Sequence, residues 1–345
     1  MNNGHNHGGL EMRLFAGTIE KGSLISTRPG TLIAISLVLI LFSGVALAAT
    51  ANPGIPQKTF TSPEEAVNAL LAALKSGDLK ELSDILGPDG KEILSSGDEV
   101  ADRNGRDQFV RMLEEKQMLD RDGDSRVVLD VGKDGWPFPI PILKVGDTWR
   151  FDTKEGKQEI LNRRIGRNEL SAIQACLAYH DAQLEYASRH RDGRGLSDYA
   201  QKFLSEPGKN DGLYWEAGEG EEESPLGPLF VGAHKKGYAM KKKVQRASPY
   251  LGYYYKILTA QGKDAPGGAY NYLVNGKMIG GFALVAYPAE YGSSGIMTFI
   301  ISHDGAVYEK DLGKNTEAVV QAMKAFNPDN TWQKVEPKFS EPHSS

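Results

Sequence analysis

The longest helical pattern in the chain covers residues 168–191. Asn168 is a suitable N-cap, Glu169 lies in the first turn where the helix dipole favours an anion, and Asp192-Gly193 ends the pattern. At 100° per residue, one narrow stripe of this helix carries Leu170, Ile173, Leu177 and Leu184. We expect the stripe to be buried and the helix to form a spine for a following β-sheet. Leu177→Asp should then unfold the C-terminal module.

Upstream of this helix, a period of 3.6 residues gives way to a period of two, which predicts a small α+β module at residues 62–161. Ser62-Pro63-Glu64-Glu65 combines an N-cap, a proline at the first helical position and early acids, so a helix should begin there. The expected helices are 62–76, 78–86 and 106–118, and the expected strands are 126–131, 138–145, 148–153 and 157–160.

Residues 162–335 are expected to form a second α+β module, in which the long helix packs on an antiparallel sheet. A short basic joint, residues 162–167, leads into the long helix. The predicted strands are 253–259, 281–287, 295–302 and 306–310, and the predicted helices after the spine are 197–204 and 315–326.

An apolar run at residues 31–49 follows Lys21 and Arg28, and Ala46-Leu47-Ala48 has the small-x-small pattern of a signal-peptidase site. We therefore expect an exported protein of the periplasm or cell envelope, cleaved after Ala48. An uncleaved inner-membrane anchor is the alternative, because the run approaches the length that spans a bilayer. The flanking segments are predicted as a disordered leader (1–30, with Met12 as an alternative start to Met1), a linker (50–61) and a disordered tail (336–345).

Composition narrows the function classes. The chain has 345 residues, of which 40% are hydrophobic and 25% charged, and this length accommodates two domains. The formal net charge of −5 argues against general nucleic-acid affinity, which needs a basic surface. With a single cysteine the chain forms neither an intramolecular disulfide nor a cysteine-based zinc site. We expect no cofactor and no metal.

No catalytic signature stands out in the sequence. A P-loop, a dinucleotide fingerprint and an H-E-x-x-H pair are all missing. Asp120, Asp122 and Asp124 alternate as in an EF-hand, but the glycine and the final acid of that loop are missing. Cys176 and His180 are i,i+4 neighbours with the reach of a thiolate–imidazole pair, although a packed cysteine beside an interface histidine explains them equally well.

A candidate binding surface combines aromatic side chains with one acid in glycine-rich surroundings. Aromatic faces beside a carboxylate are a common means of gripping sugars or extended peptides. The candidate residues are Asp211, Tyr214, Trp215, Tyr250, Tyr253 and Tyr254. The alternative is that these aromatic residues cover the sheet edge and the long helix.

Two parts of the chain resemble known folds in the order of their elements. Residues 62–161 resemble the cone-shaped folds related to nuclear transport factor 2. The motif Ala182-Gln183-Leu184-Glu185-Tyr186, the glycine-rich loops and the segment Tyr291-Gly292-Ser293-Ser294-Gly295 resemble the globular heads of type IV pilins and pseudopilins. In those proteins the spine helix continues from the N-terminal membrane helix, whereas a whole module separates the two segments here.

A more extensive resemblance covers residues 60–335. The motifs that carry it are residues 136–141 (WPFPIP), 149–152 (WRFD), 164–170 (RIGRNEL), 211–215 (DGLYW) and 265–269 (APGGA). Together they resemble the bacterial family catalogued as domain of unknown function 2950. The resemblance implies an exported bacterial protein without an established activity, and it provides no catalytic residues.

The leading hypothesis is a non-catalytic envelope protein that binds a wall polymer or a protein partner. Membrane contact is expected only through the N-terminal segment, if this segment is not cleaved. The alternative is a periplasmic hydrolase or wall-modifying enzyme that uses carboxylates alone, such as Asp211 with an acid of residues 216–223.

Overall fold

The computed structural model describes residues 57–189, 197–218, 220–238 and 248–336. The predicted leader (1–30), the apolar segment (31–49), most of the linker (50–61) and nearly all of the tail (336–345) lie outside the described residues. Within the described ranges, no helix has the length and the apolar character needed to cross a membrane.

The first hydrophobic core is built from helices that precede an antiparallel sheet. The side chain of Ser62 accepts a hydrogen bond from the Glu65 backbone N–H, and Gly77 ends the first helix with a positive φ of 68°. The predicted start and end of this helix are therefore confirmed. The helices are α1 (Pro63–Ser76), α2 (Leu79–Leu86), η1 (Pro88–Gly90), α3 (Lys91–Leu94) and α4 (Glu99–Glu115).

The sheet of the first core has the strand order β1-β2-β4-β5, and β3 also pairs with β2. Every pairing is antiparallel. In β2, Val127, Leu129 and Val131 are buried and alternate with more exposed residues, so one face of the sheet meets the helices. The strands are β1 (Gln117–Asp122), β2 (Arg126–Val131), β3 (Trp136–Pro137), β4 (Ile142–Val145) and β5 (Thr148–Phe151).

Helix α5 (Thr153–Arg189) has 37 residues and begins well before the predicted position 168. The predicted strand 157–160 is wrong, because these residues lie in the first turns of α5. The side chain of Asp152 accepts a hydrogen bond from the Glu155 backbone N–H and so caps the helix. A Cβ atom on Gly156 would lie 2.3 Å from the Pro139 carbonyl oxygen, so this glycine permits close packing rather than a turn. The predicted boundary between residues 161 and 162 lies inside α5.

The expected burial of the leucine stripe on this helix is wrong. Leu170, Leu177 and Leu184 have relative exposures of 66%, 36% and 45%. The face that packs on the second sheet is made mainly of small residues and tyrosines: Ala172, Ala175, Cys176, Tyr179, Ala182, Tyr186 and Ala187. Small helix residues allow the backbone to approach a sheet that supplies bulky side chains, so the volume of the sheet residues decides which helix face is buried.

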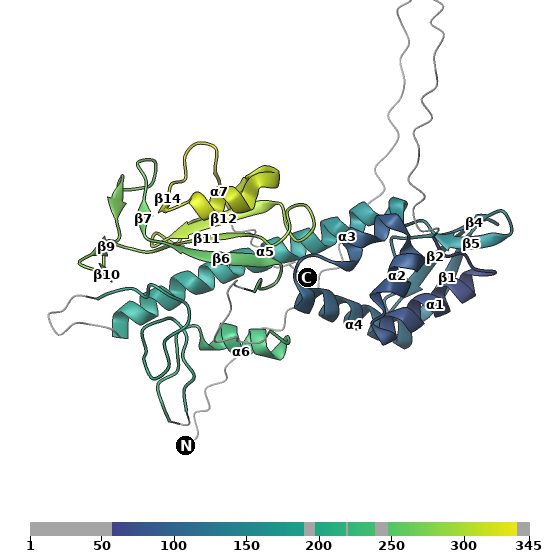
Figure 1. Ribbon diagram of the computed structural model, residues 1–345, viewed down its shortest axis with the longest axis horizontal. Helices are drawn as coiled ribbons and strands as arrows, with labels where there is room; N and C mark the ends of the chain where they lie inside the picture. The colour runs from purple at the N-terminus through teal and green to yellow at the C-terminus, as the bar shows by residue number, and fades with distance from the viewer. Residues whose placement is uncertain (1–56, 190–196, 219, 239–247, 337–345) are drawn as a thin grey trace, which may run out of the picture. The chain divides into compact units, whose positions relative to one another are not determined.

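The second core has α5 on one face of a five-stranded antiparallel sheet and α7 (Thr316–Ala322) on the other (Figure 1). All six residues of β11 are buried, as a central strand covered on both faces requires. The strand order is β15-β13-β12-β11-β6, with β6 (Tyr253–Leu258), β11 (Ala283–Pro288), β12 (Met297–Ser302), β13 (Val307–Asp311) and β15 (Gln333–Lys334). The predicted α+β fold, with a long helix on an antiparallel sheet, is confirmed.

Smaller elements complete this core. The predicted helix 197–204 is wrong, because Tyr199 and Leu204 form isolated β-bridges with Met278 and Tyr214. The predicted closing helix 315–326 is shorter, since Met323 is already extended. The remaining elements are α6 (Gly227–Lys235), β7 (Ala260–Gln261), β8 (Tyr270–Asn271), β9 (Leu273–Val274), β10 (Lys277–Met278), η2 (Gly313–Asn315) and β14 (Ala325–Phe326).

The side chain of Asp98 joins the two cores. This buried carboxylate caps α4 by accepting from the Ala101 N–H at 3.0 Å. It also accepts from the Tyr238 hydroxyl and the Gly252 N–H, each at 2.8 Å, and both donors come from the second half of the chain. A buried carboxylate is tolerated when donors replace its lost hydration, so these three bonds hold the segments together.

The burial of α5 leads to a direct test. Ala172→Asp should destabilise the fold by about 3 kcal/mol or more, because it places an unpaired carboxylate against the second sheet. Leu177→Asp should change the free energy of unfolding by only about 0.5 kcal/mol, since that side chain already meets water. Urea denaturation of both variants measures the difference. Equal loss of stability would contradict the observed orientation of the helix.

Candidate functional site

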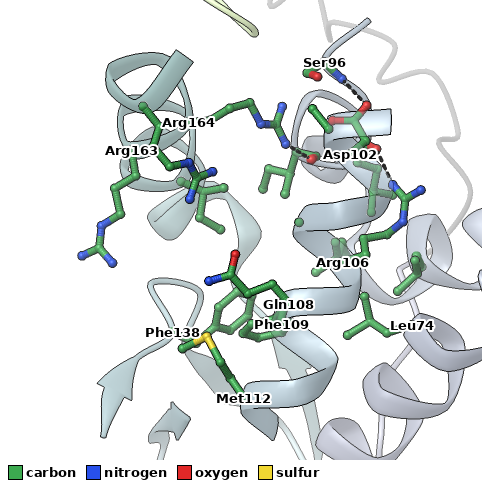
Figure 2. Close-up of a pocket in the computed structure, with 18 of the residues that line it drawn as sticks. Leu74, Ser96, Asp102, Arg106, Gln108, Phe109, Met112, Phe138, Arg163 and Arg164 are labelled. Atoms are coloured by element: carbon green, nitrogen blue, oxygen red, sulfur yellow. Dashed lines mark hydrogen bonds between the residues drawn. The ribbon is translucent and has the colours of Figure 1, made fainter. Parts of the chain in front are cut away.

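A cavity of about 360 Å³ lies in the first core, between the helices α1, α2 and α4 and the first turns of α5. Figure 2 shows its division into two ends: Phe109, Met112 and Phe138 gather on one side, whereas Asp102 and Arg164 lie on the other. The full lining is Leu70, Leu74, Leu82, Leu86, Ile93, Leu94, Ser96, Ala101, Asp102, Gly105, Arg106, Gln108, Phe109, Met112, Trp136, Phe138, Ile160, Arg163, Arg164, Arg167 and Asn168.

The apolar end of the cavity is an aromatic cluster. The Phe109 ring lies 4.9 Å from the Phe138 ring and 6.3 Å from the Trp136 ring, measured between centroids. Phe138 is buried, but Phe109 and Trp136 are only half-buried although they belong to the core cluster. Apolar side chains that line a hollow and keep accessible surface are typical of small-molecule sites.

The lining includes four guanidinium groups and a single carboxylate. Those of Arg106, Arg164 and Arg167 and the carboxylate of Asp102 lie at the polar end, whereas the guanidinium of Arg163 lies over the Trp136 ring of the aromatic cluster. Arg163, Arg164 and Arg167 come from one turn of α5, and Arg106 comes from α4. The Asp102 carboxylate accepts a hydrogen bond from the Ser96 N–H at 2.8 Å, so it is already engaged. The lining therefore has an excess of positive charge next to an apolar surface.

Arg164 is held by main-chain carbonyl groups of the α3 region. Its guanidinium donates to the Glu92 carbonyl oxygen at 2.8 Å and to the Ile93 carbonyl oxygen. Burial lowers the pKa of Arg164, and the neighbouring charges of Arg167 and Arg106 lower it further, while Asp102 raises it. These mutual effects show that three like charges lie close together at this end of the cavity.

The sequence interpretation missed this site because residues 162–167 were assigned to a joint between modules. Asp152 and Glu155 have the spacing of a capping box, which would have placed the helix start fifteen residues earlier. Once α5 is extended in this way, Arg163 and Arg167 become i,i+4 neighbours on one face. The apolar partners Trp136 and Phe138 entered the sequence analysis only through the motif 136–141 and, for Phe138, as the start of the predicted strand 138–145.

The six predicted binding residues fall into two groups with different contacts. Tyr253 is fully buried and its hydroxyl donates to the Met297 carbonyl oxygen at 2.9 Å. The Tyr254 ring packs 5.5 Å from the Tyr287 ring. The Tyr250 ring lies edge-on to Tyr238, 5.1 Å away. These three tyrosines take part in packing around the sheet, as the alternative interpretation expects.

The other three predicted residues lie in loops near α6. Asp211 pairs with Lys202 at 2.8 Å and accepts from the Glu206 N–H. Tyr214 stacks on Phe230 with 4.2 Å between ring centroids. The Trp215 indole donates to the Glu222 carbonyl oxygen at 2.9 Å. Their side chains are partly accessible, and a binding role for this group stays a prediction.

Acids of the loop 216–223 are engaged locally. Glu221 accepts from the Gly218 N–H at 2.8 Å, and Glu222 pairs with Arg189 at 3.1 Å. Lys202, Lys209 and the Glu206 N–H hold the pKa of Asp211 below its usual value, although desolvation opposes them. An ionised, ion-paired Asp211 is poorly suited to act as a general acid. Within the described ranges, no group of three or more His, Cys, Asp or Glu side chains could hold a metal ion.

Cys176 and His180 do not form a reactive pair. The thiol is fully buried in the second core. The His180 ring instead lies within hydrogen-bond distance of Asp181 (3.2 Å) and of the His303 carbonyl oxygen (3.3 Å). Burial raises the pKa of Cys176 to about 12, because the thiolate would be desolvated without a compensating charge.

The raised pKa predicts an inert thiol. A folded-state pKa of about 12 keeps Cys176 protonated at pH 8, where a free cysteine is substantially ionised. Iodoacetamide should therefore modify the native protein at least 100-fold more slowly than the urea-unfolded protein, measured by mass spectrometry. Rapid modification of the native state at pH 8 would contradict both the burial and the raised pKa.

Comparison with known proteins places the chain in a family but gives no characterised relative. No curated protein and no solved structure matches it. The resemblance to pilin heads therefore stays a prediction. A family model described as "Protein of unknown function (DUF2950)" matches residues 57–335, which is most of the chain and includes both cores. On this evidence the chain belongs to the DUF2950 family.

Proposed function

We propose that this chain is an exported, non-catalytic binding protein of the bacterial cell envelope, and that the cavity of the first core is its ligand site. The observation that carries the proposal is the cavity itself. Its volume of about 360 Å³ falls within the range of small-molecule sites, and most of its lining is aliphatic or aromatic.

The chemistry of the lining favours binding over catalysis. Arginine side chains stay protonated and do not act as general bases at neutral pH. The remaining ionisable group of the cavity, Asp102, is engaged with the Ser96 N–H. Ser96 is the lining's one hydroxyl residue. It meets Asp102 through its backbone N–H and is almost fully buried, so its hydroxyl is poorly placed to act as a nucleophile.

Location outside the cytoplasm is supported by the sequence alone. The apolar residues 31–49, the two preceding basic residues and Ala46-Leu47-Ala48 form the pattern of an export signal. An envelope protein with an apolar cavity would handle molecules that water dissolves poorly. The proposal therefore replaces the expected wall polymer with a smaller, apolar ligand, while the aromatic loops around Trp215 remain a candidate surface for a protein partner.

Gly105 offers a variant that fills the cavity without disturbing the fold. It lies on α4, lines the cavity, and has no atom within 4 Å of the place where a Cβ would stand. Gly105→Phe should lower the affinity for the neutral fluorescent ligand N-phenyl-1-naphthylamine at least tenfold. Fluorescence titration of the purified full-length chain measures the change.

Gly166→Phe is the matched control, because Gly166 lies in the interior of α5, has the same open surroundings and does not line the cavity. Both variants should keep the melting temperature, since replacing a helical glycine does not cost stability where space is open. The apolar segment 31–49 could itself bind the dye, but it is present in the unmodified chain and in both variants. The site is therefore judged from the differences in affinity among these three proteins. Equal binding by both variants and the unmodified chain would refute the proposed site.

A further inference from the structure

We propose that the ligand of this cavity is a single-chain amphiphile with a carboxylate head, of the fatty-acid class, and that Arg167 binds the carboxylate. This inference rests on the proposed function of the cavity and adds the identity of the ligand class. It rests on a difference among the four arginines of the cavity lining. Three of them already have partners within the chain, and Arg167 does not.

Three of the four guanidinium groups are already engaged. Arg163 pairs with Glu159 at 2.6 Å, and its guanidinium carbon lies 4.9 Å from the centre of the Trp136 ring. Arg164 donates to the carbonyl groups of the α3 region. Arg106 donates to the Leu94 carbonyl oxygen at 3.3 Å.

Arg167 differs from the other three. Among the residues that the structure describes, its guanidinium has neither a hydrogen-bond acceptor nor an ion-pair partner. Its surroundings nevertheless remove part of its hydration, and this desolvation lowers the pKa of Arg167. The side chain of Arg167 is exposed in the free protein and stays charged at neutral pH, so its guanidinium is open to an incoming anion. An incoming carboxylate can form two parallel hydrogen bonds to such a group.

Arg106 and Arg164 strengthen the attraction for an anion. Their contacts are to neutral carbonyl groups, which satisfy hydrogen bonds but leave the positive charge in place. The charges of Arg106 and Arg167 both lower the pKa of Arg164, which indicates that the three guanidinium groups lie in the same region. A monoanion at Arg167 would therefore be favoured over a neutral head or a cation.

The opposite end of the cavity selects the rest of the ligand. Phe109, Met112 and Phe138 present ring and thioether surfaces without hydrogen-bonding groups, away from Arg164 (Figure 2). A peptide chain would leave its own polar groups without hydrogen bonds there, whereas an alkyl chain has no polar groups to satisfy. The volume of about 360 Å³ lies near the lower limit for ligand sites, which favours one acyl chain over the two of a phospholipid.

The test is calorimetric titration of the full-length chain with octanoate, decanoate and dodecanoate, and with the alcohols of the same lengths. Affinity should rise about fourfold per added methylene in both series, because each methylene group is transferred from water to the apolar end of the cavity. Dodecanoate should bind at least tenfold more tightly than dodecanol. Arg167→Gln should remove this preference and leave the affinity for dodecanol unchanged.

Arg163→Gln is the matched control, because it removes the same formal charge from the same helix face and from the same cavity. Its charge is already used by Glu159, so the preference for dodecanoate should change less than twofold. Arg167→Gln removes no contact within the chain, so circular dichroism should show an unchanged melting temperature for this variant. Arg163→Gln gives up the contact with Trp136 and the ion pair with Glu159, so its melting temperature is measured alongside.

The outcomes separate the ligand class from the site. Equal affinities for dodecanoate and dodecanol in the unmodified chain would overturn the role of Arg167, while the cavity would still be a ligand site if Gly105→Phe weakens dodecanol binding. Tighter binding of dodecyl phosphate than of dodecanoate, dependent on Arg167, would overturn the carboxylate assignment. Binding that Gly105→Phe leaves unchanged would refute the proposed function itself.

Discussion

The continuity of α5 is the constraint on which both cores depend. Its 37 residues span about 55 Å at the rise of an α-helix, and the helix packs against the first core with one part and the second sheet with another. Because an unbroken helix fixes the rotation of every residue about its axis, the buried Ile165 and the buried Ala172 determine together where the residues between them point. Arg167 and Asn168 lie in this interval and Arg164 directly precedes it, so the polar end of the cavity is set by packing in both directions.

Polar groups where the two cores meet show how the structure deals with desolvated charge. Asp98 is buried and accepts three hydrogen bonds, and Arg164 is largely buried and reaches carbonyl oxygens of residues 92 and 93. Asn168 donates to the Ser294 carbonyl oxygen at 2.8 Å, which links the lining of the cavity to the turn between β11 and β12. In each case a polar group removed from water has found partners within the chain, as structural polar groups do. Arg167 differs from these groups, because its guanidinium is exposed and has no hydrogen-bond or ion-pair partner among the described residues, and it is therefore available to a ligand.

Local signals in the sequence predicted much of the fold. They could not predict contacts between residues that are far apart in the chain. Capping residues placed α1, and runs of apolar and aromatic residues placed β6, β11 and β12 within two residues. Gly156 serves close packing on the Pro139 carbonyl, which no local pattern in the sequence shows. The leucines of α5 failed as a guide for a similar reason, since bulky residues of the sheet require small residues on the facing helix. The cavity was missed because its lining comes from segments that are separated by dozens of residues.

The exposed leucines of α5 raise the question of which apolar surface is functional. Leu170, Leu177 and Leu184 follow each other at intervals of seven residues, so neighbouring members are about 10 Å apart along the axis. The exposed polar residues Gln174 and Asp181 lie between them on the same side of the helix, which divides the stripe into single side chains. Isolated exposed leucines of this kind are ordinary features of protein surfaces. The cavity differs because its apolar side chains converge on one hollow and meet cations at its end. Convergence of unlike groups, rather than exposure alone, is what makes the first core the place to look for a ligand.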